Sequence, residues 1–253
     1  MLAITREISP AFQDCQLTFL NREPIDLAKA HQQHANYEQA LRNLGCTVET
    51  LPADPEFPDS VFVEDTAIVL DEIAVISRPG DLTRRGETDS IAKALQNYRK
   101  IVHLENPATL DGGDVLNFQR TLYVGVSRRT NRAGIQALRA CVEPHGYRVQ
   151  AVEVAQCLHL KTAVSQVTPD RLLLNREWVD PKIFGKAHCL NVASGEPMAA
   201  NALYLPNGVI YPTASPRTRR ILEEAGLKLH LVDFSEMAKA EAGATCCSLI
   251  FSR

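Results

Sequence analysis

The sequence lacks the features that mark several large classes of protein. Its net charge is −3, with 27 basic against 30 acidic residues, so no positive excess is present to hold a phosphate backbone, and we expect no nucleic-acid binding. It contains no apolar run near the length that a membrane span requires. The start, from Met1 to Glu7, lacks the basic residues and apolar stretch of a signal peptide.

Disulfide and zinc signatures are missing as well. The seven cysteines are odd in number and form no C-x-x-C pair, which predicts a reducing, cytoplasmic compartment. No stretch resembles a linker or a low-complexity segment, and the 45 % hydrophobic content is enough to form a core. We therefore expect a single domain over residues 1–253.

What the sequence does contain is a weak internal repeat. In three places a helical spacing of apolar residues leads to a glycine, which suits a helix end, and then to an alternating strand pattern. The helical parts are residues 34–44, 133–142 and 219–225, and the strands are residues 46–51, 147–152 and 227–232.

Pairs of short apolar strands form the second part of the repeat. Residues 65–70 are expected to pair with 73–77, residues 114–116 with 121–125, and residues 201–205 with 208–211. The opening positions near residues 65, 114, 161, 201 and 246 lie roughly 40–50 residues apart, a spacing typical of propeller-like arrays. Five such α/β units closed in a ring would direct polar residues into a central cavity. An open α/β sheet with similar units is the alternative.

A cysteine and a histidine are the candidates for nucleophilic chemistry. A thiolate is a strong nucleophile, and a nearby imidazole can keep it ionised or pass a proton to a leaving group. His159 lies in an alternating apolar–polar stretch, which predicts a strand edge facing a cavity. Each residue alone also fits simple packing, since a lone histidine or a buried cysteine needs no function.

Strand geometry distinguishes the two adjacent cysteines. The run from Thr245 to Phe251 has the composition of a strand, and side chains on a strand alternate between faces. Cys247 then shares a core-like face with Leu249 and Phe251, whereas Cys246 shares the other face with Ser248. The pattern predicts Cys246 as the exposed thiol.

Acids and arginines supply complementary charge for a basic amino acid. Asp59, Glu64 and Asp65 lie within seven residues around an apolar run, so these acids are expected to meet a cation, such as a guanidinium that a carboxylate can bind in bidentate fashion. Arg84 and Arg129 occupy matching places in two repeats and could bind a carboxylate. Asp111 precedes two glycines, which allow close approach of the backbone.

Together these motifs resemble the dimethylarginine dimethylaminohydrolase family. They are Pro58-Asp-Ser-Val-Phe-Val-Glu-Asp65, Ser77-Arg-Pro-Gly80 with Arg84-Arg85, Leu110-Asp-Gly-Gly-Asp-Val-Leu116, Arg129-Thr-Asn131, Leu158-His-Leu-Lys161 and Thr245-Cys-Cys-Ser-Leu249, in the family's order. The resemblance covers the chain from about residue 15 to the end and implies the pentein fold, a five-bladed α/β propeller with pseudo-fivefold symmetry.

The resemblance also implies the reaction and the role of each site residue. The reaction is the hydrolysis of methylated arginine to citrulline and a methylamine, with no metal or organic cofactor, in a protein that could form a homodimer. Cys246 would be the nucleophile, His159 the general acid and base, and Asp111 the residue that orients His159. The substrate-binding set would be Glu64 and Asp65 at the guanidinium, Asp59 at the amino-acid end, Arg84 and Arg129 at the α-carboxylate, and the backbone carbonyls of Leu17, on a lid, and Ala240.

Three other functions remain open from the sequence. An arginine deiminase-like enzyme would use nearly the same motifs on free arginine, although such enzymes usually carry an added helical region. A non-catalytic ring that binds arginine-like ligands would not need the set of Cys246, His159 and Asp111. A peptidase-like cysteine hydrolase would not need the charged amino-acid pocket.

Overall fold

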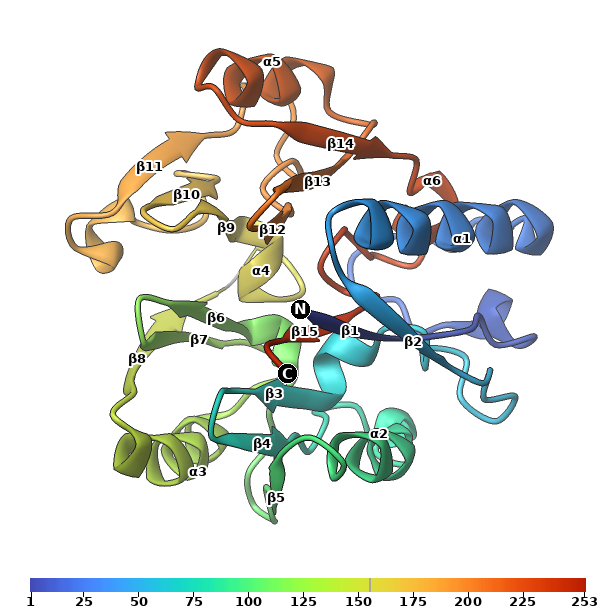
Figure 1. Cartoon of the computed structure of the whole chain (residues 1–253), viewed down its shortest axis with the longest axis vertical. Helices are drawn as coiled ribbons and strands as arrows, with labels where there is room; N and C mark the ends of the chain where they lie inside the picture. The colour runs from blue at the N-terminus through green and yellow to red at the C-terminus, as the bar shows by residue number, and fades with distance from the viewer. Residues whose placement is uncertain (155) are drawn as a thin grey trace.

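The fold is a ring of five small sheets around a central axis, seen in a computed structural model that describes residues 1–154 and 156–253. Figure 1 shows the sheets arranged as blades, with α1, α2, α3 and α5 on the outside and both termini near the centre. Each sheet has three strands, and each mixes one antiparallel pair with one parallel pair. The expected five-bladed α/β propeller is therefore confirmed, and the open sheet is wrong.

Every blade follows the same order of elements from the axis outward. The inner strands are β3 (Ala67–Val69), β6 (Val115–Phe118), β9 (Val164–Thr168), β12 (Leu203–Leu205) and β15 (Leu249–Phe251). The middle strands are β4 (Ile73–Ile76), β7 (Thr121–Val126), β10 (Arg171–Leu174), β13 (Gly208–Pro212) and β1 (Leu2–Arg6). The outer strands are β5 (Lys100–His103), β8 (Arg148–Glu153), β11 (His188–Asn191), β14 (Leu229–Val232) and β2 (Thr47–Leu51).

Helices make the crossovers between the parallel middle and outer strands. They are α2 (Glu87–Leu95), α3 (Arg132–Val142), the 3₁₀ helix η6 (Pro181–Phe184), α5 (Pro216–Glu224) and α1 (Leu27–Asn43). The shorter helices are η1 (Phe12–Asp14), η2 (Val63–Thr66), η3 (Leu82–Arg84), η4 (Gly112–Asp114), η5 (Glu143–His145), α4 (Leu160–Ala163) and α6 (Ser235–Ala238). No helix among the residues that the structure describes combines the length and apolar character needed to cross a membrane.

The two ends of the chain share one blade and so close the ring. The C-terminal strand β15 pairs with the N-terminal strand β1, with Leu2 opposite Phe251 and Ile4 opposite Leu249. Because β15 is an inner strand, the turn that precedes it lies at the axis. The ring closure therefore carries the two adjacent cysteines to the centre of the molecule.

The predicted glycine stops are present at three helix ends. Gly45, Gly146 and Gly226 have φ values of 91°, 80° and 82°, a left-handed conformation that glycine adopts without a steric penalty. On the α3 unit, Asn131 caps the helix by accepting from the Gly134 N–H, and Leu138 on the apolar face is fully buried. Local sequence thus sets the start of α3 and the end of η5, the 3₁₀ helix that continues it.

Two local predictions near the axis are wrong. Residues 244–247 form a turn, and the strand begins at Leu249, so the cysteines do not lie on a strand. His159 is the N-cap residue immediately before α4, with extended backbone angles, and does not lie at a strand edge. In both cases a tight turn replaces the expected strand start, because the chain must bend toward the axis before each inner strand.

Candidate active site

A histidine held between two carboxylates forms the centre of the site. His159 Nε2 lies 3.1 Å from Asp111 Oδ2, and its Nδ1 lies 3.8 Å from Asp65 Oδ1. Asp111 is itself fixed, because its Oδ1 accepts from the Gly80 N–H at 2.8 Å. All three side chains are buried, so the His159 imidazole has a fixed orientation and little access to bulk water.

The paired glycines of the Asp111 motif are required by close packing around this histidine. A Cβ on Gly113 would lie 2.6 Å from His159 Nδ1 and 2.7 Å from Asp65 Oδ1. A Cβ on Gly112 would lie 2.0 Å from the Glu64 carbonyl oxygen. The Gly113 N–H also donates to Asp65 Oδ1 at 2.9 Å. The glycines therefore allow close approach of the backbone, as the sequence predicted. The groups that they approach are His159, Asp65 and the Glu64 backbone.

The charges around His159 favour its protonated form. Burial favours the neutral ring, but the carboxylates of Asp65, Asp111 and Asp114 outweigh burial and raise the pKa of His159 to about 9. Burial likewise opposes the ionisation of Asp65, yet His159 and Arg84 lower the pKa of this carboxyl below its ordinary value. At neutral pH the site therefore holds an imidazolium that can donate a proton.

The candidate nucleophile lies in the turn that precedes β15. Cys246 Sγ accepts from the Gly243 N–H at 3.3 Å, and the Cys246 carbonyl accepts from the Glu64 N–H at 3.1 Å. Burial, followed by the charges of Glu64 and Asp65, raises the pKa of Cys246 to about 12, so the resting group is a thiol. Cys247 is fully buried in the apolar core, whereas Cys246 lines the site cavities.

The separation of the two cysteines thus agrees with the prediction, but its reason differs. The turn, and not strand alternation, directs Cys247 inward. Ser248, which was expected to face the same cavity as Cys246, has its hydroxyl 2.6 Å from the Tyr37 hydroxyl and is buried.

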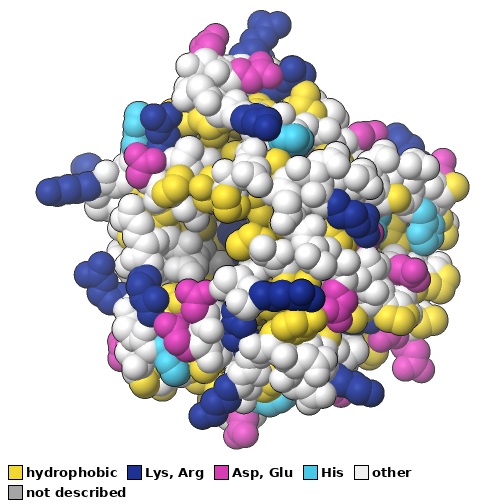
Figure 2. Space-filling view, viewed as in Figure 1, with side chains coloured by type: hydrophobic (Ala, Val, Ile, Leu, Met, Phe, Trp, Pro, Cys, Tyr) yellow, Lys and Arg dark blue, Asp and Glu magenta, His cyan; other side chains and the backbone are white. Residues whose placement is uncertain are grey.

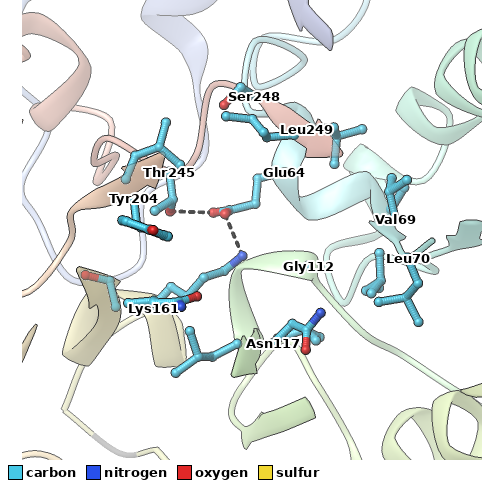
Figure 3. Close-up of a pocket in the computed structure, with 18 of the residues that line it drawn as sticks. Glu64, Val69, Leu70, Gly112, Asn117, Lys161, Tyr204, Thr245, Ser248 and Leu249 are labelled. Carbon is cyan, nitrogen blue, oxygen red and sulfur yellow. Dashed lines mark hydrogen bonds and ion pairs between the residues drawn. The ribbon is translucent and has the colours of Figure 1, made fainter. Parts of the chain in front are cut away.

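An ion pair closes the far end of the site along the propeller axis. The Lys161 ammonium donates to Glu64 Oε1 at 2.5 Å, and the Thr245 hydroxyl donates to Glu64 Oε2 at 2.7 Å. Figure 3 shows Lys161 and Thr245 converging on this carboxylate from two different blades. Burial raises the pKa of Glu64, and Lys161 offsets part of this effect. Glu64, expected at the substrate guanidinium, therefore already has a cation within the chain.

On the other side of this ion pair lies an open chamber of about 410 Å³. Met1, Asn117, Tyr204 and Ile250 are among its lining residues, so it opens beside the chain termini. Figure 2 shows a hollow near the centre of this face, bordered by hydrophobic side chains. The Glu64 ion pair separates this chamber from the cysteine and the histidine.

The site itself has two connected parts, and both are lined by Cys246 and His159. The larger part, which we call the large chamber, has a volume of about 250 Å³ and is lined mainly by apolar groups. The smaller part, the small chamber, measures about 20 Å³. Its lining consists of Gln16, Asp59, Phe62, Asp65, Arg84, Arg129, Leu158, His159, Ala240, Glu241, Ala242 and Cys246.

The small chamber brings together most of the residues selected from the sequence. Seven of the ten predicted site residues line it, and they are Asp59, Asp65, Arg84, Arg129, His159, Ala240 and Cys246. Asp111 lies behind His159, and Glu64 lines the large chamber. Leu17 packs against the apolar core beside this region. The neighbouring Gln16 N–H donates to the Asp59 carboxylate at 3.0 Å, so the N-terminal segment covers this end of the site.

The two arginines differ in the partners they already have. Arg84 is buried, and it donates to Asp65 at 2.6 Å, to Glu87 at 2.8 Å and to two backbone carbonyls. Arg129 Nη2 donates to the Thr18 hydroxyl at 3.3 Å, and its Nη1 lies 3.7 Å from Asp81. In this structure Arg129 has more donor capacity for a substrate carboxylate than Arg84, because each of the three guanidinium nitrogens of Arg84 already has a protein partner.

The geometry also permits a cation site at the histidine. Ligand atoms of Asp65, Asp111 and His159 lie within 4.8 Å of one another. However, these atoms already bind backbone N–H groups, Arg84 and each other. We explain the cluster as a proton-transfer group, which needs no ion to be complete.

Three residues at the site were missed as functional residues. Lys161 and Asp114 were within quoted motifs but were given no role. Asp114 is buried and accepts from the Leu160 N–H at 2.9 Å, next to His159, and burial raises its pKa to about 6. Glu241 lines both chambers, and no sequence pattern marked it. The motifs that contain Lys161 and Asp114 could have suggested these two residues. Glu241 could not be found in this way, because its contacts are distant in sequence.

Five α/β blades around a cavity that holds a thiol, an imidazole and several carboxylates define a pentein-type protein. Residues 11–180 match the family described as N,N dimethylarginine dimethylhydrolase, eukaryotic. The chain belongs to the dimethylarginine dimethylaminohydrolase family.

Its similarity to relatives of this family extends over nearly the whole chain. The N(G),N(G)-dimethylarginine dimethylaminohydrolase of Streptomyces coelicolor is 39 % identical over 251 residues, 98 % of this chain and 95 % of the relative. That of Pseudomonas aeruginosa is 36 % identical over 228 residues, 89 % and 90 % of the two chains. A structure of the Pseudomonas aeruginosa protein, a cysteine-to-serine mutant complexed with citrulline, matches with a TM-score of 0.95 and 34 % identity, covering 99 % of this chain and 98 % of that one.

Proposed function

We propose that this protein hydrolyses Nω-methylated arginine, both the asymmetric dimethyl and the monomethyl form, to citrulline and a methylamine. The observation that carries the proposal is the small chamber, where a thiol, an imidazolium, three carboxylates and two arginines line one cavity. The named relatives and the citrulline complex of a homologue support the same reaction. The charge pattern suits a cationic side chain at one end of the ligand and a carboxylate at the other.

Substrate binding prepares the nucleophile. Because the pKa of Cys246 is about 12 in the resting site, the thiol needs help to ionise at neutral pH. A guanidinium held by Asp65 places a positive charge beside the sulfur, which favours the thiolate. The carboxylate also fixes the guanidinium carbon within reach of the sulfur, a proximity effect.

The first chemical step forms a bond between Cys246 Sγ and the guanidinium carbon. His159 donates the proton on Nδ1, the ring nitrogen that is not bonded to Asp111, to the methylated nitrogen. The C–N bond breaks, the methylamine leaves neutral, and a covalent thiouronium-like adduct remains on Cys246. Water then attacks the same carbon, and neutral His159 accepts one of its protons. The C–S bond breaks as the remaining proton passes to the sulfur, which releases citrulline and restores the Cys246 thiol and the imidazolium.

The amino-acid end of the substrate is assigned to the remaining lining residues. Asp59 and the backbone carbonyls of Leu17 and Ala240 accept from the α-ammonium group. Arg129 binds the α-carboxylate, and Arg84 joins it where its contact with Asp65 yields to the substrate guanidinium. The Glu64 carboxylate, paired with Lys161, lies at the guanidinium end of the substrate.

The wider description of the protein also belongs to this proposal. We propose one catalytic domain over residues 1–253, supported by the single closed ring. A cytoplasmic location is supported by seven cysteines that all remain free thiols. A homodimer is a prediction, which analytical ultracentrifugation would test.

The experiment is a citrulline assay with asymmetric dimethylarginine, monomethylarginine and free arginine in parallel. Turnover of the methylated substrates above arginine supports the proposal, whereas preference for arginine would assign the protein to the deiminase-like alternative. His159→Ala should lose about 10² to 10⁴ in turnover while substrate binding largely survives. Near-normal turnover of this variant would remove His159 from the mechanism.

A further inference from the structure

One carboxylate near the C-terminus holds three successive backbone N–H groups of the N-terminal segment. Glu241 accepts from the N–H groups of Thr18 at 3.0 Å, Phe19 at 2.5 Å and Leu20 at 2.6 Å. Successive N–H groups that converge on one anion form a nest, which binds negative charge through aligned dipoles. Here the bound anion is a side chain of the same protein, 221 to 223 residues away.

The backbone at Glu241 is unusual and lies beside the site. Its φ is 60°, in the left-handed region that residues other than glycine rarely adopt. It follows Ala240, which lines the small chamber, and precedes Gly243, whose N–H donates to Cys246 Sγ. A contact that holds the N-terminal segment is therefore built into the loop that leads directly to the turn that carries the nucleophile.

Polar contacts, more than apolar burial, hold residues 18–20 of the N-terminal segment in place. Phe19 and Leu20 are 46 % and 45 % exposed, so the segment gains little from the hydrophobic effect. Leu17 also packs against the apolar core, and the Arg128 guanidinium lies over the Phe19 ring. The segment's other hydrogen bonds to the site are the Gln16 N–H on Asp59 and the Thr18 hydroxyl on Arg129. Both partners are substrate-binding residues in the proposed function, and a bound substrate would take over their charges. Glu241 is the anchor that does not depend on the amino-acid end of the ligand.

We propose that Glu241 is a positioning residue that latches residues 16–22 over the amino-acid end of the site. By holding this segment closed, it keeps the Leu17 backbone beside the small chamber and so sets the affinity for the amino-acid part of the substrate. It takes no part in the bond-breaking step. The statement about substrate rests on the proposed function, whereas the latch itself does not.

The latch is tested first without any substrate. Glu241→Gln removes the charge, Glu241→Ala removes the acceptor, and Glu223→Gln is the matched control, because Glu223 pairs with Arg219 on the surface of α5. Hydrogen exchange in the peptide of residues 16–22, and trypsin cleavage after the exposed Arg22, report how often the segment opens. We expect both rates to rise about tenfold or more in the two Glu241 variants, the loss of one charge-assisted hydrogen bond, and to stay unchanged in the control. Unchanged exchange and cleavage in Glu241→Ala would overturn the proposal.

Kinetics then distinguish a latch from a general structural role. In Glu241→Gln the KM for methylarginine should rise about tenfold with kcat little changed. The rate at which 2-chloroacetamidine, which has no amino-acid end, alkylates Cys246 should stay as in the native protein. Equal losses with the substrate and the small reagent would mean that Glu241 supports the reacting centre, and this would refute the latch. If the native protein fails to turn over methylarginine, the proposed function fails, but the exchange and cleavage results still decide the latch.

Discussion

The hydrogen bond between His159 and Asp111 should set the upper pH limit of activity. Asp111→Asn replaces the carboxylate with an amide of nearly the same shape, so the contact from the Gly80 N–H can be kept by the amide oxygen. The variant loses the negative charge 3.1 Å from His159 Nε2, in a region where both side chains are buried. The fold should therefore survive while the electrostatics of the histidine change.

The size of the change follows from that contact. A hydrogen bond to a charged group contributes about 1.5–3 kcal/mol, and one pKa unit corresponds to about 1.36 kcal/mol. A carboxylate favours the protonated ring, so its removal should lower the pKa of His159 from about 9 by about one to two. At pH 8 most of the native protein then carries the imidazolium, whereas at most about half of the variant does.

Citrulline release measured from pH 6 to pH 10 tests this reasoning. The native kcat, measured at saturating substrate where the bound guanidinium favours the Cys246 thiolate, should fall on the basic side near pH 9, where His159 loses the proton that the leaving amine needs. In Asp111→Asn this fall should move to lower pH, and Asp89→Asn, an exposed residue on α2, should leave it unmoved. A basic limb that stays in place or moves to higher pH in Asp111→Asn would refute the assignment of His159 as the acid.

Four further changes give distinct expected outcomes. Cys247→Ser should keep turnover and lower Tm, because its hydroxyl would be fully buried in apolar surroundings; lost turnover at unchanged Tm would contradict this. Gly113→Ala should reduce kcat in a folded protein, because the new methyl would lie 2.6 Å from His159 Nδ1, and native kcat would contradict the packing argument. Arg84→Leu should cost about 3–5 kcal/mol of stability in denaturant titrations, because it removes the guanidinium that pairs with two buried carboxylates, Asp65 and Glu87. Arg129→Leu should mainly raise KM about tenfold. A larger loss of stability in Arg129→Leu than in Arg84→Leu would make Arg129, and not Arg84, the structural arginine.

The fold could be predicted from the sequence where local rules decide it. Glycines at helix ends, such as Gly45 and Gly226, and alternating strand patterns recur at a regular spacing. This repeat can be recognised from local sequence, without knowledge of contacts between distant residues. Ring closure is different, because β15 pairs with β1 across the whole chain and only the spacing of the last unit suggested it. The strand assigned to residues 245–248 was wrong, since strand propensity does not reveal that the chain must turn toward the axis.

The site was predicted in its membership but not in its pairings. The sequence motifs selected residues that line one cavity, because the family order of motifs carries that information. It did not reveal that Lys161 neutralises Glu64 or that Glu87 and Asp65 share Arg84, since these pairs depend on the relative placement of side chains. Glu241 could not be predicted at all, because its partners are backbone N–H groups that carry no sequence signature.

The covalent adduct on Cys246 is the central claim, and trapping it is the most direct test. The protein would be incubated with asymmetric dimethylarginine, quenched in acid during turnover and digested with trypsin. The tryptic peptide from Ala240 to Arg253 contains both adjacent cysteines, so fragment ions decide which sulfur carries the added mass. The account predicts citrulline in solution and the amidino adduct on Cys246, with neither formed by Cys246→Ser. Turnover by Cys246→Ser, or an adduct on Cys247, would contradict it.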